Sequence, residues 1–141
     1  MTLTDGVARV DIAVIEVAAP IPPHSAGGDV RLDLRLTCEG FTSEASSWID
    51  RDVWQRFLRE LERLVDRRDG EAVVESMSPK DLRLRLFATD HAGHMAVDGQ
   101  ARTRSVGDLR WQFGAIQFDP SLLPLLLAEL GAAHLEGRKV D

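Results

Sequence analysis

Apolar and polar residues alternate with a period of two through most of the chain between residues 81 and 118. This alternation is typical of antiparallel strands that bury one face and leave the other in water. We expect a strand on each side of the polar turn at 90–93, preceded by a short strand that contains residues 73–74. The strand before the turn has these inward positions: Leu82, Leu84, Leu86 and Ala88.

The turn at 90–93 also determines which residues face each other across the two strands. A four-residue loop places Arg85 opposite Asp98 and Asp81 opposite Arg102. Opposite charges at facing positions stabilise the solvated face of a sheet. The charge pattern and the apolar pattern therefore predict the same register.

A second reversal near residues 105–108 leads into the last strand and predicts that Phe113 covers Gly99. The large apolar residues of that strand change parity midway. We therefore expect a β-bulge at 114–115 that turns all of them toward the core. These side chains are Trp111, Phe113, Ile116 and Phe118.

The first half of the chain predicts strands within residues 7–17 and across 30–39, with a weaker third at 41–48. The loop 18–28 contains three prolines and two glycines. Because it lies between two strand-like segments, we interpret it as a long hairpin connection rather than a domain boundary.

Two helices are expected. The first is capped by Ser47 or Asp50, has apolar residues at three- and four-residue spacing, and is stopped by Gly70. The second is rich in leucine and starts at Asp119-Pro120. All three tryptophans fit apolar positions and are expected to anchor the core: Trp48, Trp54 and Trp111.

Together these elements predict an α+β fold. We expect an antiparallel meander sheet of about six strands with two helices packed on one face, in the order β-β-(β)-α-β-β-β-β-α. A length of 141 residues suits one domain that buries its own core, so residues 1–141 are interpreted as a single domain.

Charge and composition narrow the function classes. The net charge is −6, from 17 basic and 23 acidic residues, and no segment is a basic tract, which argues against nucleic-acid binding. An acidic chain is steered toward a basic partner if it has one; the alternative is that the acidity serves solubility alone. No window reaches the roughly 18 apolar residues of a membrane span, and residues 1–6 do not resemble a signal peptide. Cys38 is the single cysteine, so we expect a cytoplasmic protein.

Candidate chemistry is sparse. His91 and His94, beside Asp90, are the nearest approach to a metal-ligand cluster, but a zinc site needs three or four protein ligands. Cys38 has the inward parity of a strand, which suits a small buried side chain rather than a nucleophile. We therefore expect no catalytic residues, no metal and no cofactor, and interpret the protein as not an enzyme.

The solvated face of the predicted sheet is the most informative surface. Arginine and aromatic residues are enriched where proteins bind partners. The predicted partner-binding residues are Arg83, Arg85, Phe87, Asp98, Arg102 and Arg110. The alternative is an ordinary wet face of neutralised ion pairs, which contribute little.

Four segments, taken in order, carry a family resemblance: residues 52–61, 76–86, 90–99 and 111–123. They combine a helix, a strand entered through Gly-His-hydrophobic, and a helix entry of the form Phe-Asp-x-x-Leu-Leu. This pattern, across roughly residues 30–130, resembles the WapI-type immunity proteins of bacterial contact-dependent toxin systems and their uncharacterised relatives. The resemblance implies a small cytoplasmic protein that binds and blocks a toxin domain. Such toxins are commonly basic.

We therefore expect a non-enzymatic binding protein, an immunity protein whose partner is a basic toxin domain. Two alternatives stay open. One is a small-molecule-binding or enzymatic α+β domain with a pocket between sheet and helices. The other is a structural or oligomerisation module that uses a sheet edge. The oligomeric state is open as well.

Overall fold

The computed structural model describes residues 1–78, 80–103 and 107–140, with residues 134–140 described by their backbone alone. Within those residues the chain forms eight strands and two helices, ordered as two ββββα halves. The elements are β1 (Thr2–Thr4), β2 (Ala8–Val17), β3 (Val30–Cys38), β4 (Phe41–Ile49), α1 (Arg51–Arg67), β5 (Glu71–Glu75), β6 (Leu82–Ala88), β7 (Met95–Thr103), β8 (Leu109–Phe118) and α2 (Leu122–Val140).

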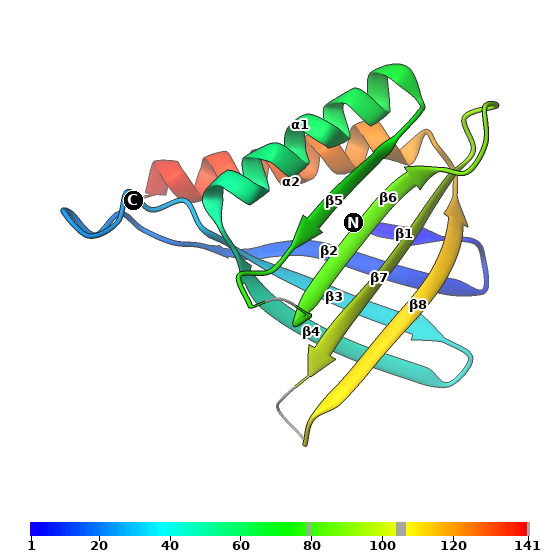
Figure 1. Cartoon of the computed structure of the whole chain (residues 1–141), viewed down its shortest axis with the longest axis horizontal. Coiled ribbons are helices and arrows are strands. Elements are labelled where there is room, and N and C mark those ends of the chain that lie inside the picture. Colours follow the sequence, from blue (N-terminus) through cyan, green and yellow to red (C-terminus); the bar gives the residue numbers. More distant parts are fainter. Residues whose placement is uncertain (79, 104–106, 141) are drawn as a thin grey trace.

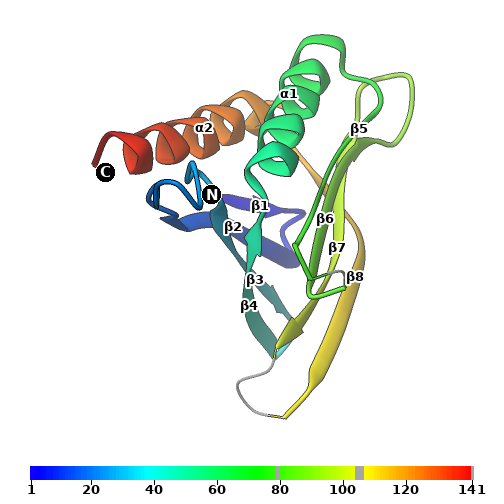
Figure 2. The same ribbon diagram turned by 60° about the vertical axis from the view of Figure 1, so that its left-hand side comes forward.

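The α+β class with antiparallel strands is confirmed, but the single sheet of about six strands is wrong. The strands form two four-stranded sheets, β1-β2-β3-β4 and β5-β6-β7-β8, and every pair within each sheet is antiparallel. Figure 1 shows β5–β8 crossing in front of β1–β4. In Figure 2 the two helices lie together above β1–β4, with β5–β8 beside them. Alternation assigns each strand its faces, whereas it does not say which sheet the strand joins.

The first sheet has the expected faces. Val10 and Ile12 on β2 lie opposite Leu36 and Leu34 on β3, so both strands turn the same apolar parity inward. Residues 18–29 connect β2 to β3, which pair antiparallel. β1, which was not expected, adds three residues at the outer edge of the sheet.

The second sheet confirms the predicted register in detail. Arg85 lies opposite Asp98, and Gly99 lies opposite Phe113. Between the pairs Val97–Ile116 and Gly99–Phe113, β7 contributes one residue and β8 contributes two, Gly114 and Ala115. This is the expected β-bulge. The predicted reversal at 105–108 includes residues 105 and 106, which lie outside the described residues. Pro79, between β5 and β6, lies outside them too.

The first helix begins as predicted but ends differently, whereas the second begins at Leu122 rather than at the predicted Asp119-Pro120. Asp50 is the N-cap of α1 and accepts a hydrogen bond from the backbone N–H of Asp52. The left-handed residue that ends α1 is Arg68, with φ 56°, rather than Gly70. Before α2, the Asp119 carboxylate accepts from the backbone N–H of Ser121 at 2.9 Å, as a capping residue does.

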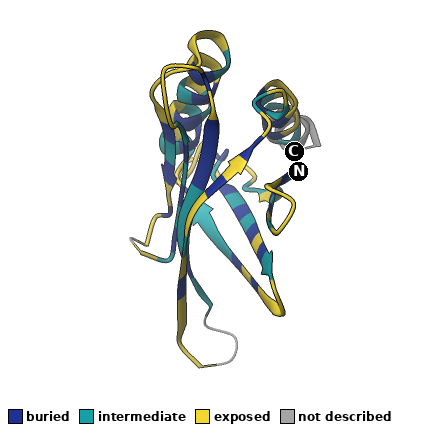
Figure 3. Cartoon of the chain, turned by 90° about the vertical axis from the view of Figure 1, so that its right-hand side faces the viewer, coloured by how far each residue is buried: buried dark blue, intermediate teal, exposed yellow. Residues whose placement is uncertain are grey.

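The core is one continuous cluster to which all ten elements contribute side chains. Trp54, Phe57 and Leu61 of α1 are fully buried and fill the space between the helices and the sheets. Figure 3 shows the alternation of buried and exposed residues as stripes along the strands. Trp111 is buried as expected, but Trp48 is not in the core: it is half-buried and lies opposite Arg31, on the polar face of the first sheet. Within the described residues, neither helix has the length and hydropathy of a membrane span.

Candidate functional site

The face of the β5–β8 sheet that points away from the core, called the outer face below, carries mostly polar side chains. Its register follows from the buried Leu82, Leu84 and Leu86, because the residues between them on β6 must point to the opposite side. The outer face consists of Glu71, Val73, Glu75, Arg83, Arg85, Phe87, Ala96, Asp98, Gln100, Arg102, Arg110 and Gln112. All six predicted site residues therefore lie on it.

Arg85 is held on the outer face by two carboxylates and an aromatic ring. Its Nε and Nη2 atoms donate to the two carboxylate oxygens of Asp98 at 3.2 and 2.7 Å, and Nη1 donates to Glu71 at 3.3 Å. The guanidinium carbon lies 4.0 Å from the centroid of the Phe87 ring. The hydrogen bond to Asp98 raises the pKa of Arg85 above its ordinary value. Both the charge of Arg85 and the face of Phe87 are thus already used within the protein.

Arg102 is held in a similar way by a different carboxylate. Its Nε and Nη2 atoms donate to Asp108 at 2.5 and 2.7 Å, and its Nη1 lies 4.0 Å from Asp81. The hydrogen bond to Asp108 raises the pKa of Arg102 above its ordinary value. Arg110 reaches the same Asp108 only at 3.9 Å, and its side chain remains 67% exposed.

Two further cations of this region, Arg83 and Lys80, make no ion pair with the residues that the structure describes. Within the same residues, neither makes a side-chain hydrogen bond. Glu75 lies opposite Arg83 on β5 without an ion pair between the two side chains, and Asp98 on β7 accepts its two hydrogen bonds from Arg85. Four of the six predicted residues are therefore engaged in close contacts: Arg85, Phe87, Asp98 and Arg102. The other two are Arg83, without an ion pair in the described residues, and Arg110, with one ion contact at 3.9 Å.

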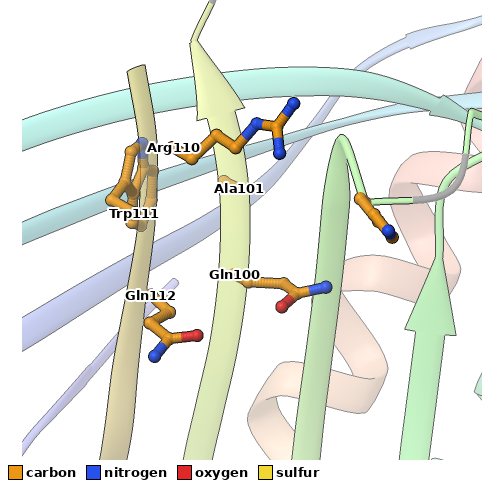
Figure 4. A pocket seen from close by; sticks show the side chains of 6 residues that line it. Gln100, Ala101, Arg110, Trp111 and Gln112 are labelled. Atoms are coloured by element: carbon orange, nitrogen blue, oxygen red, sulfur yellow. The ribbon is translucent and has the colours of Figure 1, made fainter. Parts of the chain in front are cut away.

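Lys80, Arg83 and Arg110 border a groove that runs over β7 and β8. It consists of two adjoining hollows of about 280 Å³ each, which share the side chains of Gln100 and Gln112. Lys80 and Arg110 line one hollow, and Arg83 lines the other. Figure 4 shows Arg110 and Gln112 reaching from β8 toward β7, and Gln100 reaching from β7 toward β6. We call this the glutamine groove.

Lys80 was missed as a site residue. It belongs to the turn between β5 and β6 and has a left-handed backbone, with φ 75°. Alternation within a strand says nothing about a residue in such a turn. The alternation places the two glutamines on the same face as the arginines. They were not predicted as site residues because they carry no charge.

A separate hollow of about 390 Å³ lies where the two sheets meet. Here the Thr103 hydroxyl on β7 donates to the backbone carbonyl of Glu44 on β4 at 2.9 Å. Burial, and then the neighbouring Glu44 carboxylate, raise the pKa of Asp33 to about 6, against the opposing effect of Arg31 and Arg35. The hollow thus holds a carboxyl group that changes charge close to neutral pH.

The predicted polar turn at 90–93 is held by hydrogen bonds to the Asp90 carboxylate. His94 Nδ1 lies 2.7 Å from Asp90, whose carboxylate also accepts from the backbone N–H of Ala92 at 2.9 Å. The hydrogen bond with His94 lowers the pKa of Asp90 below its usual value. In the part of the chain that the structure describes, no three His, Cys, Asp or Glu side chains form a group that could hold a metal ion. Cys38 is half-buried, at the end of β3.

The geometry defines a two-sheet α+β protein with an open, hydrogen-bonding sheet face. No family model matches the chain, and no curated protein matches it. Among solved structures it is similar to the plant transcriptional regulator PBF-2, at 10% sequence identity and a TM-score of 0.46. The match covers 95% of this chain and 79% of that one. A similarity at this level supports no inference about function.

Proposed function

We propose that this protein is a non-enzymatic binding protein that contacts a partner protein through the outer face of β5–β8. Most concretely, we propose an immunity protein that binds and neutralises a bacterial toxin domain in the cytoplasm. One observation carries the choice of surface: Lys80 and Arg83, which make no ion pair in the described residues, and Arg110, whose ion contact is 3.9 Å long, surround two carboxamides in an open groove on a sheet.

The packing of the interior favours a surface over an internal pocket. The space between the sheets and the helices, where a small-molecule pocket was the alternative, is filled by Trp54, Phe57 and Leu64, which are at most 1% exposed. The glutamine groove, in contrast, is open and lies on strands, whose backbone positions are fixed by ladders on both sides of β7. A rigid support of this kind limits the entropy lost on binding.

The toxin partner comes from the family resemblance across roughly residues 30–130. A net charge of −6 suits it, because an acidic protein attracts a basic domain at long range and speeds the encounter. Local contacts at the outer face would then set the orientation of the complex. Long-range steering and short-range recognition use different charges, so an acidic protein with a cationic groove is consistent with a basic partner.

The test is growth rescue in bacteria. A toxin domain encoded beside this protein's gene would be expressed together with the wild-type chain, with R83Q/R110Q, or with the matched variant R59Q/R63Q, which removes two exposed charges from α1. We expect rescue by the wild type and by R59Q/R63Q, and at least a tenfold lower colony count with R83Q/R110Q. No rescue by the wild type against any neighbouring toxin would contradict the proposed function. Equal rescue by both variants would place the contact on another surface.

A further inference from the structure

The cations and carboxamides that line the glutamine groove indicate the class of ligand that it binds. We propose that it binds an extended acidic segment of the partner protein, with carboxylates paired to Lys80, Arg83 and Arg110 and the peptide backbone hydrogen-bonded to Gln100 and Gln112. This inference rests on the proposed function, because it specifies what the outer face recognises.

Positive charges outnumber the available carboxylates in the glutamine groove. Asp98 lines the groove, but it accepts two hydrogen bonds from Arg85, which lies outside the lining. Arg83 is left without an ion pair in the described residues, Lys80 likewise, and Arg110 has only the 3.9 Å contact to Asp108. An excess of positive charge therefore collects in one groove of a chain whose net charge is −6. Carboxylates are the complementary groups on a protein partner.

The two glutamines supply the second half of the recognition. Gln100 on β7 lies directly opposite Gln112 on β8. On its other side, Gln100 lies directly opposite Arg83 on β6. Each carboxamide offers both a donor and an acceptor, which is what a peptide N–H and C=O require. With strands about 4.8 Å apart, the row from Arg83 to Gln112 spans about 10 Å, and an extended peptide covers that distance in about three residues. A segment with acids two or three positions apart would reach cations at both ends.

A nucleic acid fits the groove less well than an acidic peptide. The net charge of −6 repels a polyanion at long range, where a nucleic-acid binder needs attraction. Recognition of single strands also depends on exposed aromatic rings for base stacking. The Phe87 ring on this face is already covered by Arg85 at 4.0 Å. Of the aromatic residues that line the groove, Trp111 is buried and Phe113 is half-buried, so neither is an exposed stacking platform.

Glu75 limits the strength of the site. It is the cross-strand neighbour of Arg83 on β5, although no ion pair joins the two side chains. A flexible carboxylate at this position competes for Arg83 in solution, so Glu75→Gln should tighten the binding of an acidic segment. We expect a gain of a few fold, because exposed charges interact weakly.

The experiment is a selection of random twelve-residue peptides on the free wild-type protein, followed by affinity measurement. We expect the selected peptides to carry two or more Asp or Glu residues within four positions. Their affinity should fall at least tenfold in R83Q/R110Q, stay within twofold in R59Q/R63Q, and weaken with salt. Circular dichroism and melting temperature confirm that each variant is folded.

Two results would overturn the inference. One is the selection of peptides without acidic residues, or of acidic ones that bind R83Q/R110Q as well as the wild type. The other is a random single-stranded twelve-nucleotide DNA or RNA that binds the groove more tightly than the selected peptides. Because the selection needs no toxin, its failure leaves growth rescue intact as an independent measure of the proposed function. Likewise, a failed rescue does not alter the peptide result.

Discussion

The ring of Phe113 lies across Gly99 of the neighbouring strand, and the two residues are directly opposed. A Cβ atom added at Gly99 would lie 3.0 Å from Cε1 and Cζ of that ring and 2.7 Å from the backbone carbonyl oxygen of Arg83. The ring could shift slightly, but the carbonyl belongs to the sheet and could not. The close approach of β6 to β7 therefore requires glycine at this position.

Gly99→Ala should accordingly lower the free energy of unfolding by about 1–3 kcal/mol, the usual cost of forcing an extra carbon into a packed site. Urea unfolding followed by circular dichroism measures this. Gly114 provides the matched control, because it lies on the adjacent strand and a Cβ there would meet nothing within 4 Å. Equal effects of Gly99→Ala and Gly114→Ala would show that the close contact is not the cause.

Glu60 joins α1 to the outer edge of the second sheet. Its carboxylate accepts the backbone N–H of Val73 at 3.1 Å, a group that points away from β6. Glu60→Ala should cost about 1–2 kcal/mol of unfolding free energy, because it leaves that N–H unpaired. Glu60→Gln keeps an acceptor and should lose less, and Glu62→Ala, at an exposed helix position, should be near neutral. A loss at Glu62 equal to that at Glu60 would contradict the assignment.

Asp33 should make the stability depend on pH. Its pKa is about 6 in the folded chain and 3.8 in its ordinary state, so the folded chain binds the proton more tightly. The favourable contribution is present below pH 4 and is lost as the pH rises to about 6. Asp33→Asn should therefore gain stability relative to the wild type across that window, by about 1 kcal/mol at pH 7 after solvent screening of this partly exposed group. A difference between the two proteins that is flat from pH 4 to pH 7 would refute this.

Arg83 and Arg85 should give opposite results although they are two residues apart on the same face. Arg85→Gln breaks the hydrogen bonds to Asp98 and should lower the unfolding free energy by about 1 kcal/mol, since both side chains are partly exposed. Arg83→Gln breaks no ion pair in the described residues, so it should leave the unfolding free energy unchanged. It should lower the affinity for acidic peptides about threefold or more. Calorimetry and peptide titration of both variants separate the two roles. Weaker stability in Arg83→Gln would mean that this arginine is structural.

Much of the fold follows from the sequence, because alternation and turn length determine face and register. The pairing of Arg85 with Asp98, the contact of Phe113 with Gly99 and the bulge opposite Asp98 were all predictable in this way. The division into two sheets was not, since each strand pattern is compatible with either sheet. β1 was missed because three residues are too few to show a period.

The candidate site was predictable only as a face. The sequence indicates that Arg83, Arg85 and Arg102 share one side of the sheet and that Arg85 faces Asp98, but not that Arg102 binds Asp108 or that Arg83 makes no ion pair in the described residues. Those outcomes depend on side-chain geometry: Asp98 binds Arg85, and Glu75, although opposite Arg83, forms no ion pair with it in the described residues. Trp48 was placed wrongly for a related reason, because hydrophobicity suggested the core while its register put it opposite Arg31.

The four sheet edges have a common consequence for how this protein meets other chains. β1 is three residues long, β5 has an N–H covered by Glu60, and β8 is interrupted by its bulge. On β4, the carbonyl of Trp48 accepts from the backbone N–H of Met77 at 2.9 Å. Each edge is thus blunted by a different device, which hinders strand-by-strand growth into aggregates. Copies of this chain should therefore not associate through their strand edges. A partner protein should dock on a sheet face instead of adding a strand.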